Sequence, residues 1–149
     1  MNDLNKTAVI SILNKIMQYE LSGVVRYTHY ALMIFGHNRI PITKWLRDQA
    51  NESLLHANKA GEMITHFGGH PSLRIGKLLE TEKHDIDSIL KESLDHEITA
   101  TKLYRELLAI VKNQSILLED YCIKMIAEEE LHVGEVNKML RSPGDLDFQ

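Results

Sequence analysis

The stretch LEDYCIKMIAEEELHVGEVNKM, residues 118–139, decides the fold of this chain. Its apolar residues recur in alternating steps of three and four, which predicts one face of an α-helix packed against other helices. The same face carries Glu129 and His132, and residues three apart lie on one side of a helix. A buried carboxylate and imidazole need a partner for their charge. The members of this face are Leu118, Cys122, Met125, Glu129, His132, Val136 and Met139.

Three other segments repeat the pattern, with polar residues at positions where a helix buries apolar ones. Glu20 and Glu97 each interrupt an otherwise apolar face, and Glu52 and His56 share a third. Each face thus places a carboxylate or an imidazole near the middle of a helix. The predicted helices cover about residues 3–35, 43–67, 85–112 and 115–141.

The ends of these helices are predicted from residues that cap or stop helices. Asp3, Thr43 and Ser115 are the expected N-caps, because their side-chain oxygens can accept hydrogen bonds from the first helical turn. Gly36 is expected to end the first helix, and the glycine pair at residues 68–69 the second.

Helices about twice as long as the globular average must bury a long face against one another, so the predicted fold class is all-α. Residues 69–83 form the longest irregular stretch and can cross along the bundle. This favours a ferritin-like four-helix bundle with a long crossover between helices two and three. The alternative is an up-down-up-down bundle with a loose middle loop. Residues 1–149 are expected to form one domain, with an irregular tail over 142–149.

Composition excludes several classes of protein. The chain has 149 residues and a net charge of −4 without a basic tail, so nucleic acid is not an expected partner. No apolar run approaches the roughly 18 residues of a membrane span, and the first residues do not read as a secretory signal. Cys122 is the single cysteine and cannot form an internal disulfide, so we expect a cytoplasmic protein with this thiol in the core.

The buried polar residues predict a metal centre. Burying several carboxylates costs several kcal/mol each unless something neutralises them, which metal ions do directly. Carboxylates with imidazoles and no thiolate suit iron or manganese. The di-iron carboxylate bundle uses a Glu from each of two helices and a Glu-x-x-His from each of the other two. Glu20 and Glu97 match the single carboxylates, and Glu129 with His132 forms a complete Glu-x-x-His.

The second Glu-x-x-His is imperfect. Ser53 lies three residues before His56, and the carboxylate lies four before it, at Glu52. Residues four apart still share a helix face, and a π-bulge could correct the remaining phase difference. Glu52 is therefore the predicted sixth ligand, with a five-ligand site completed by water as the alternative.

Together these residues resemble bacterioferritin. The similarity rests on Glu20 with Tyr27, the stretch Ser53-Leu54-Leu55-His56-Ala57, Glu97, and the run Glu128-Glu129-Glu130-Leu131-His132. The resemblance implies a ferroxidase that oxidises Fe²⁺ with O₂ or H₂O₂ at an intrasubunit di-iron centre. It also implies storage of the ferric mineral in a homo-oligomeric cage. Tyr27 resembles the family's tyrosine beside the centre, where it could bind a ligand by a hydrogen bond or supply an electron.

Two departures from bacterioferritin change what is expected. Leu54 occupies the position of the haem-ligating methionine, so haem is not expected by that route. Only 17 residues follow His132, and the last eight read as irregular, so we do not expect the fifth helix of 24-subunit cages. The 12-subunit Dps-like cages lack that helix. Both cage sizes therefore stay open.

Other functions stay open as well. They are a rubrerythrin-type di-iron peroxidase or oxidase without storage, a Dps-like protective mini-ferritin, and a metal-free scaffold. The histidines outside the predicted centre are expected at surfaces, loops or pores. These are His29, His37, His66, His70, His84 and His96.

Overall fold

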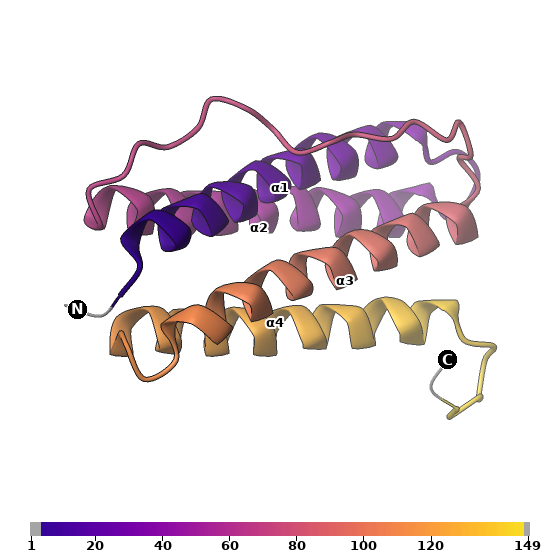
Figure 1. Ribbon diagram of the computed structural model, residues 1–149. Helices are drawn as coiled ribbons and strands as arrows, with labels where there is room; N and C mark the ends of the chain where they lie inside the picture. The colour runs from indigo at the N-terminus through magenta and orange to yellow at the C-terminus, as the bar shows by residue number, and fades with distance from the viewer. Residues whose placement is uncertain (1–3, 148–149) are drawn as a thin grey trace.

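The computed structural model describes residues 4–147, and its regular structure is entirely helical (Figure 1). The four helices pack into one bundle, which confirms the predicted all-α fold class. They are α1 (Lys6–Met33), α2 (Arg39–His66), α3 (Ile86–Val111) and α4 (Ile116–Leu140). No helix in residues 4–147 is long and apolar enough to cross a membrane.

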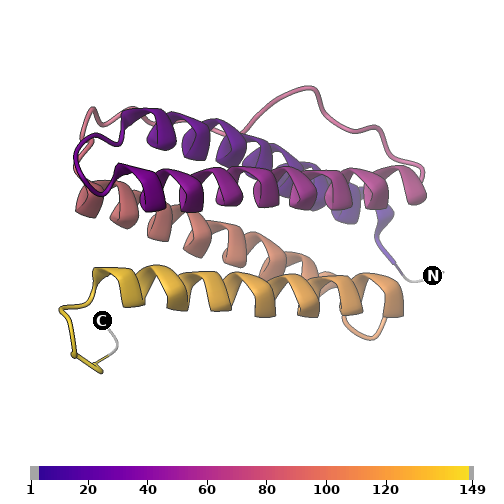
Figure 2. The same ribbon diagram turned by 180° about the vertical axis from the view of Figure 1, so that it is seen from behind.

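The connection between α2 and α3 spans the length of the bundle, as Figures 1 and 2 both show. As a result α3 runs in the same direction as α2, and α4 runs in the same direction as α1. This arrangement agrees with the predicted crossover and excludes the up-down-up-down alternative. The crossover, residues 67–85, contains no regular secondary structure.

Contacts with α1 hold the first part of the crossover in place. The side chain of Asn14 donates to the carbonyl of His70 at 3.2 Å and accepts from the N–H of Ser72 at 2.8 Å. Further along, the N–H of Gly76 donates to the carbonyl of Gln18 at 2.7 Å. A Cβ at Gly76 would lie 3.1 Å from the Cα of Tyr19, so a larger residue would have to move the crossover slightly away from the helix.

The start of α2 differs from the prediction. The helix begins at Arg39 rather than Thr43, and Asn38 occupies the N-cap without a side-chain hydrogen bond. Pro41 falls in the first turn, where helical N–H groups have no intrahelical partner and proline is tolerated. Thr43 is therefore a buried residue inside the helix and not its cap.

The other helix ends lie within a few residues of the predicted ones. Asp3 lies outside the described residues, and Asn5 caps α1 by accepting from the N–H of Ala8 at 3.1 Å. Gly36, with φ of +96°, turns the chain after α1. Ser115 caps α4 as predicted, and its hydroxyl accepts from the N–H of Leu118 at 3.2 Å. Residues 141–147 contain no helix, in agreement with the predicted irregular tail.

The apolar core has two parts with a polar layer between them. The larger part joins the start of α1, the end of α2, the end of α3 and the start of α4, and it contains Leu13, Tyr104 and Cys122. The smaller part joins the opposite ends of α1, α2 and α3 and contains Tyr30 and Leu46. Cys122 is buried as predicted, and burial raises the pKa of its thiol to about 12.

The helices pack as two hairpins along one shared seam. Close backbone contacts join α1 with α2, α3 with α4, and α1 with α3. Among the described residues, no Cα atoms of α2 and α4 lie within 8 Å of each other. Side chains therefore have to bridge the space between α2 and α4, and the polar layer does so.

Candidate metal centre

The polar layer brings together all six residues predicted to bind metal. They line one small pocket at mid-bundle, in which Gln49 and Ser53 also take part. The six are Glu20 on α1, Glu52 and His56 on α2, Glu97 on α3, and Glu129 and His132 on α4.

One half of the pocket is formed by Glu20, His56 and Glu129, which are all buried. The Nδ1 atom of His56 lies 3.5 Å from Glu20 Oε2 and 3.1 Å from Glu129 Oε1. One donor atom from each residue lies within 4.8 Å of the other two. Two carboxylates and an imidazole thus point at one place from three different helices.

The other half is formed by Glu97, Glu129 and His132, which meet the same 4.8 Å limit. Glu129 therefore belongs to both halves and lies between them. Glu52 joins this half from α2, because its Oε2 lies 3.1 Å from His132 Nε2. Its Oε1 lies 3.8 Å from His56 Nε2, so Glu52 also reaches toward both histidines.

Glu129 carries the clearest sign that the layer suits a cation. Its Oε2 is buried and has no hydrogen-bond partner in residues 4–147. A buried carboxylate oxygen without a partner carries the full desolvation penalty of that group. A cation between the two halves would remove that penalty, which fits the donor set to metal ions.

The spacing of Glu52 and His56 works without a helix defect. The helix α2 is regular from Arg39 to His66, so the π-bulge considered for this site is not present. Four residues of separation place both side chains on one helix face, and the long Glu52 side chain reaches across to His132.

Ser53, which stands where the sequence pattern would place a carboxylate, positions Glu20. Its hydroxyl lies 2.7 Å from the Glu20 carbonyl oxygen and 2.9 Å from Glu20 Oε2, within donating distance of both. Gly23 makes this contact possible, because a Cβ there would lie 2.3 Å from Ser53 Oγ and 2.8 Å from His96 Nε2. Tyr104 donates to the other oxygen of Glu20, Oε1, at 3.3 Å.

Glu128 is a part of the site that sequence reasoning missed. Its Oε1 lies 3.3 Å from His56 Nε2, on the side of the ring away from Glu20. The run Glu128-Glu129-Glu130 reads as a solvated acidic face apart from Glu129. Helix geometry could have predicted its position, because a residue adjacent to Glu129 is rotated by about 100° around the helix and can thus lie toward α2.

Tyr27 lies beside the centre, as the resemblance implied. Its hydroxyl donates to Glu97 Oε1, and the ring is fully buried. Burial, followed by the charge of Glu97, raises the pKa of Tyr27 well above its usual value. Tyr27 is therefore a proton donor that stays neutral in the folded protein.

His96 does not lie at a surface, loop or pore, so that expectation is wrong. The side chain is buried and stacks on Tyr19, with ring centroids 4.3 Å apart. Burial, together with the charge of Arg26, lowers the pKa of His96 to about 3. The burial of His96 results from its close packing against Gly23 of α1. The periodicity of a single helix does not predict such a contact between helices.

Charges inside the layer compensate one another. Burial lowers the pKa of His56, but hydrogen bonds to Glu129 and Glu20 outweigh it and raise the value to about 11. Contact with Glu52 raises the pKa of His132 to about 9, and the same contact lowers that of Glu52 to about 2.

The deepest carboxylates shift in the opposite direction. Burial raises the pKa of Glu20, and burial with the nearby Glu129 raises that of Glu97 well above the ordinary range. Both shifts disfavour the ionised form of the carboxyl group, as burial and a neighbouring carboxylate do in general. A positive charge placed between these carboxyls would oppose both shifts.

The solvent-exposed edge of the centre is formed by residues of α2 and α4. Glu52, Glu128 and His132 are partly exposed, whereas Glu20, His56 and Glu129 are buried. The partly exposed residues belong to α2 and α4, the two helices without close backbone contact. An ion can therefore approach between α2 and α4.

Comparisons with known proteins agree with this architecture. The family model described as ferritin-like domain matches residues 10–143. No curated protein sequence matches the chain significantly.

Solved structures of similar fold include three bacterial proteins. Ferritin-like diiron-carboxylate proteins from Bacillus anthracis have a TM-score of 0.85 and 23% identity, covering 91% of this chain and 97% of that one. The bacterioferritin-related dodecameric thioferritin of Bacteroides fragilis has a TM-score of 0.83 and 21% identity, covering 93% and 88%. Desulfovibrio desulfuricans bacterioferritin, whose structure describes a diiron site, has a TM-score of 0.82 and 22% identity, covering 91% and 79%.

Proposed function

The chain belongs to the ferritin-like family, and from that premise we propose that it is a ferroxidase that stores iron. Its substrates are Fe²⁺ and O₂ or H₂O₂, and its product is ferric mineral kept inside a homo-oligomeric cage. The observation that carries this proposal is the pair of three-residue donor groups that share Glu129. A cytoplasmic location is part of the proposal, in keeping with a single buried thiol.

The two donor groups suggest how the residues divide between two ferrous ions. Glu20 and His56 hold one ion, and Glu97 and His132 hold the other. Glu129 bridges them, because it belongs to both groups and has an oxygen without a partner. Glutamates and histidines without cysteine are ligands that iron accepts in either oxidation state.

Glu52 is the second shared carboxylate in this proposal. Its two oxygens face Nε2 of His56 and Nε2 of His132, so it reaches both histidines. It is also partly exposed, unlike Glu129. A carboxylate at the solvent side of the centre can accept an incoming ion and deliver it to the buried ligands.

Residues around the ligands hold them in position. Nδ1 of His56 faces the carboxylates, which leaves Nε2 to donate to Glu128. Such a contact fixes the orientation of a ligating imidazole. Ser53 does the same for Glu20, and Tyr27 for Glu97.

Two ferrous ions held side by side supply the two electrons that reduce O₂ to H₂O₂, with two protons taken up. The protein's own part includes the proton balance. Ion binding displaces protons from His56 and His132, whose pKa values lie above neutrality in this structure. Tyr27 remains protonated and keeps its hydrogen bond to Glu97.

The ferroxidase proposal is tested by a double substitution, His56→Ala with Glu129→Ala. Removing one imidazole and the bridging carboxylate should slow the oxidation of Fe²⁺ by at least about 100-fold. The rate is measured by stopped-flow absorbance of the ferric product, and helix content by circular dichroism.

Glu130→Ala is the matched control. Glu130 lies next to Glu129 but is exposed and pairs with Arg105 outside the centre. This variant should oxidise iron at the wild-type rate. Wild-type speed in the double variant with intact helix content would overturn the proposal.

A further inference from the structure

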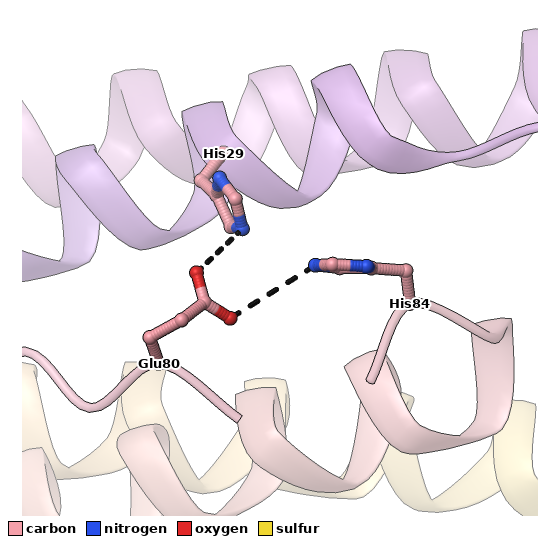
Figure 3. Close-up of side chains that lie close together, drawn as sticks. All are labelled: His29, Glu80 and His84. Carbon is pink, nitrogen blue, oxygen red and sulfur yellow. Dashed lines mark ion pairs between the residues drawn. The ribbon is translucent and has the colours of Figure 1, made fainter. Parts of the chain in front are cut away.

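A second cluster of metal-ligating side chains lies outside the centre described above. It contains His29 on α1, and Glu80 and His84 near the end of the crossover. Figure 3 shows the three side chains converging, with both oxygens of Glu80 directed at the two imidazoles. They border a surface pocket that none of the six central residues lines.

The distances suit three donors around one ion. His29 Nε2 lies 3.3 Å from Glu80 Oε2, and His84 Nε2 lies 3.9 Å from Glu80 Oε1. One donor atom of each residue lies within 4.8 Å of the other two. The two imidazole rings are 5.5 Å apart and inclined at 66°, so they do not stack on each other.

The imidazole nitrogens that face Glu80 pair with it ionically but have no hydrogen-bond partner among the described residues. Nε2 of His29 and Nε2 of His84 are both shielded from solvent, and neither makes a well-formed hydrogen bond with the residues described. The local backbone holds Glu80 in place, because its Oε1 accepts from the N–H of Glu82 at 2.7 Å. A carboxylate paired ionically with two imidazole nitrogens that have no hydrogen-bond partner is an arrangement that a cation can complete.

The donor chemistry identifies the kind of ion. Two imidazoles and one carboxylate are the protein ligands of many zinc sites that leave a fourth position to water. The same set suits other divalent ions of intermediate softness, whereas Ca²⁺ and Mg²⁺ prefer oxygen ligands only.

We propose that His29, Glu80 and His84 form a binding site for a Zn²⁺-type divalent ion that ties the crossover to α1. The first part of the crossover is already joined to α1 through Asn14 and Gln18. Toward its end, ionic contact with α1 depends on His29. An ion bound there would hold the crossover at both ends.

The charged residues next to the three proposed ligands make their own contacts at the edge of the site. Arg26 donates to the hydroxyl of Tyr30 at 3.3 Å, and that hydroxyl donates to Glu92 at 2.8 Å. Glu92 also accepts a hydrogen bond from Thr81, which connects the crossover to α3. Lys83 borders the same pocket.

The test compares metal content in the full-length protein. Wild type and His84→Ala are incubated with Zn²⁺, passed through a desalting column, and analysed for zinc per chain by mass spectrometry. His84→Ala should bind one equivalent fewer than wild type, and His29→Ala should show the same loss. His70→Ala is the matched control, because His70 lies in the crossover with an exposed side chain outside the cluster, and it should bind as wild type does.

Hydrogen exchange gives an independent readout. Zn²⁺ should slow exchange of the backbone amides of residues 78–84 in wild type and in His70→Ala, but not in His84→Ala. Equal zinc content in wild type and His84→Ala would overturn the proposal, and so would unchanged exchange in wild type. Neither result depends on iron oxidation, so the ferroxidase proposal can fail or stand separately.

Discussion

The contact between Gly23 and Ser53 sets how closely α1 approaches α2 beside the centre. Ser53 occupies the space that a side chain at residue 23 would need, and it holds Glu20 by two contacts. A glycine inside a helix is unfavourable by about 1 kcal/mol relative to alanine. Its presence here indicates that close approach is worth more than helix propensity at this position.

Gly23→Ala should therefore destabilise the protein despite the gain in helix propensity. The methyl group would push on Ser53 and His96, and overpacking of this kind costs about 1–3 kcal/mol. The melting temperature of the metal-free protein should fall, and Fe²⁺ should bind more weakly because Glu20 loses its position.

Gly134→Ala supplies the comparison for that experiment. Gly134 lies within α4 and has nothing within 4 Å of where its Cβ would be. Alanine there should leave the melting temperature unchanged or raise it. A Gly23→Ala variant that melts as high as Gly134→Ala would contradict the packing argument.

Periodicity in the sequence could predict the inward-facing residues, but not their contacts. Glu20, Glu97 and Glu129 stand in phase with apolar neighbours, and that phase alone is enough to predict their burial. Glu128 and His96 fall between the phases, and only the approach of neighbouring helices determines what they meet. Metal binding by the six central residues stays a prediction until it is measured.

At the scale of the helices, the capping residues differ in how much they contribute. The side chain of Asp85 accepts from the N–H of Ser88 at 3.0 Å at the start of α3. Asn38 occupies the same position before α2 without a side-chain hydrogen bond. The two positions therefore allow a direct comparison between an N-cap with a side-chain hydrogen bond and an N-cap without one.

Asp85→Ala should lower the melting temperature by a few °C, because it removes the hydrogen bond that the N–H of Ser88 donates to this N-cap side chain. Asn38→Ala should change the melting temperature much less. Equal losses in the two variants would show that the Asp85 hydrogen bond contributes nothing.

The sequence predicted the approximate positions of all four helices, but it misplaced the start of α2. Ser115 precedes a polar-to-apolar transition, and the structure confirms it as the cap of α4. Thr43 has the right chemistry for a cap, but α2 extends back past Pro41 to Arg39. Proline disrupts the interior of a helix but is tolerated in the first turn. The sequence alone does not show which of these two positions Pro41 occupies.

At the scale of the whole molecule, the proposed cage requires surfaces that pack against other copies. Large apolar side chains are exposed around the turn between α1 and α2, namely Leu32, Phe35 and Ile40. Contiguous exposed apolar residues often mark interaction surfaces.

Light scattering coupled to size-exclusion chromatography tests the cage. We expect a mass near 12 or 24 times the 17.1 kDa of one chain. Phe35→Asp should shift the protein to smaller species, because it places a charge where an apolar contact would form. A wild-type monomer or dimer would make storage untenable and favour a rubrerythrin-type oxidase without storage.

The length of the crossover was predictable, but its path was not. A long irregular segment between helices two and three favours a connection along the bundle, as the structure shows. Which helix it follows depends on contacts such as Gly76 with Gln18, between residues that share no pattern in the sequence. The convergence of His29 with Glu80 and His84 is a product of that path.

The separation of α2 from α4 changes what holds these two helices together at mid-bundle. Among the described residues, the two hairpins share close backbone contacts only along α1 and α3. On the opposite side, His56 and His132 reach across to Glu129 and Glu52. The contact between α2 and α4 at this level therefore depends on charged side chains and not on backbone packing.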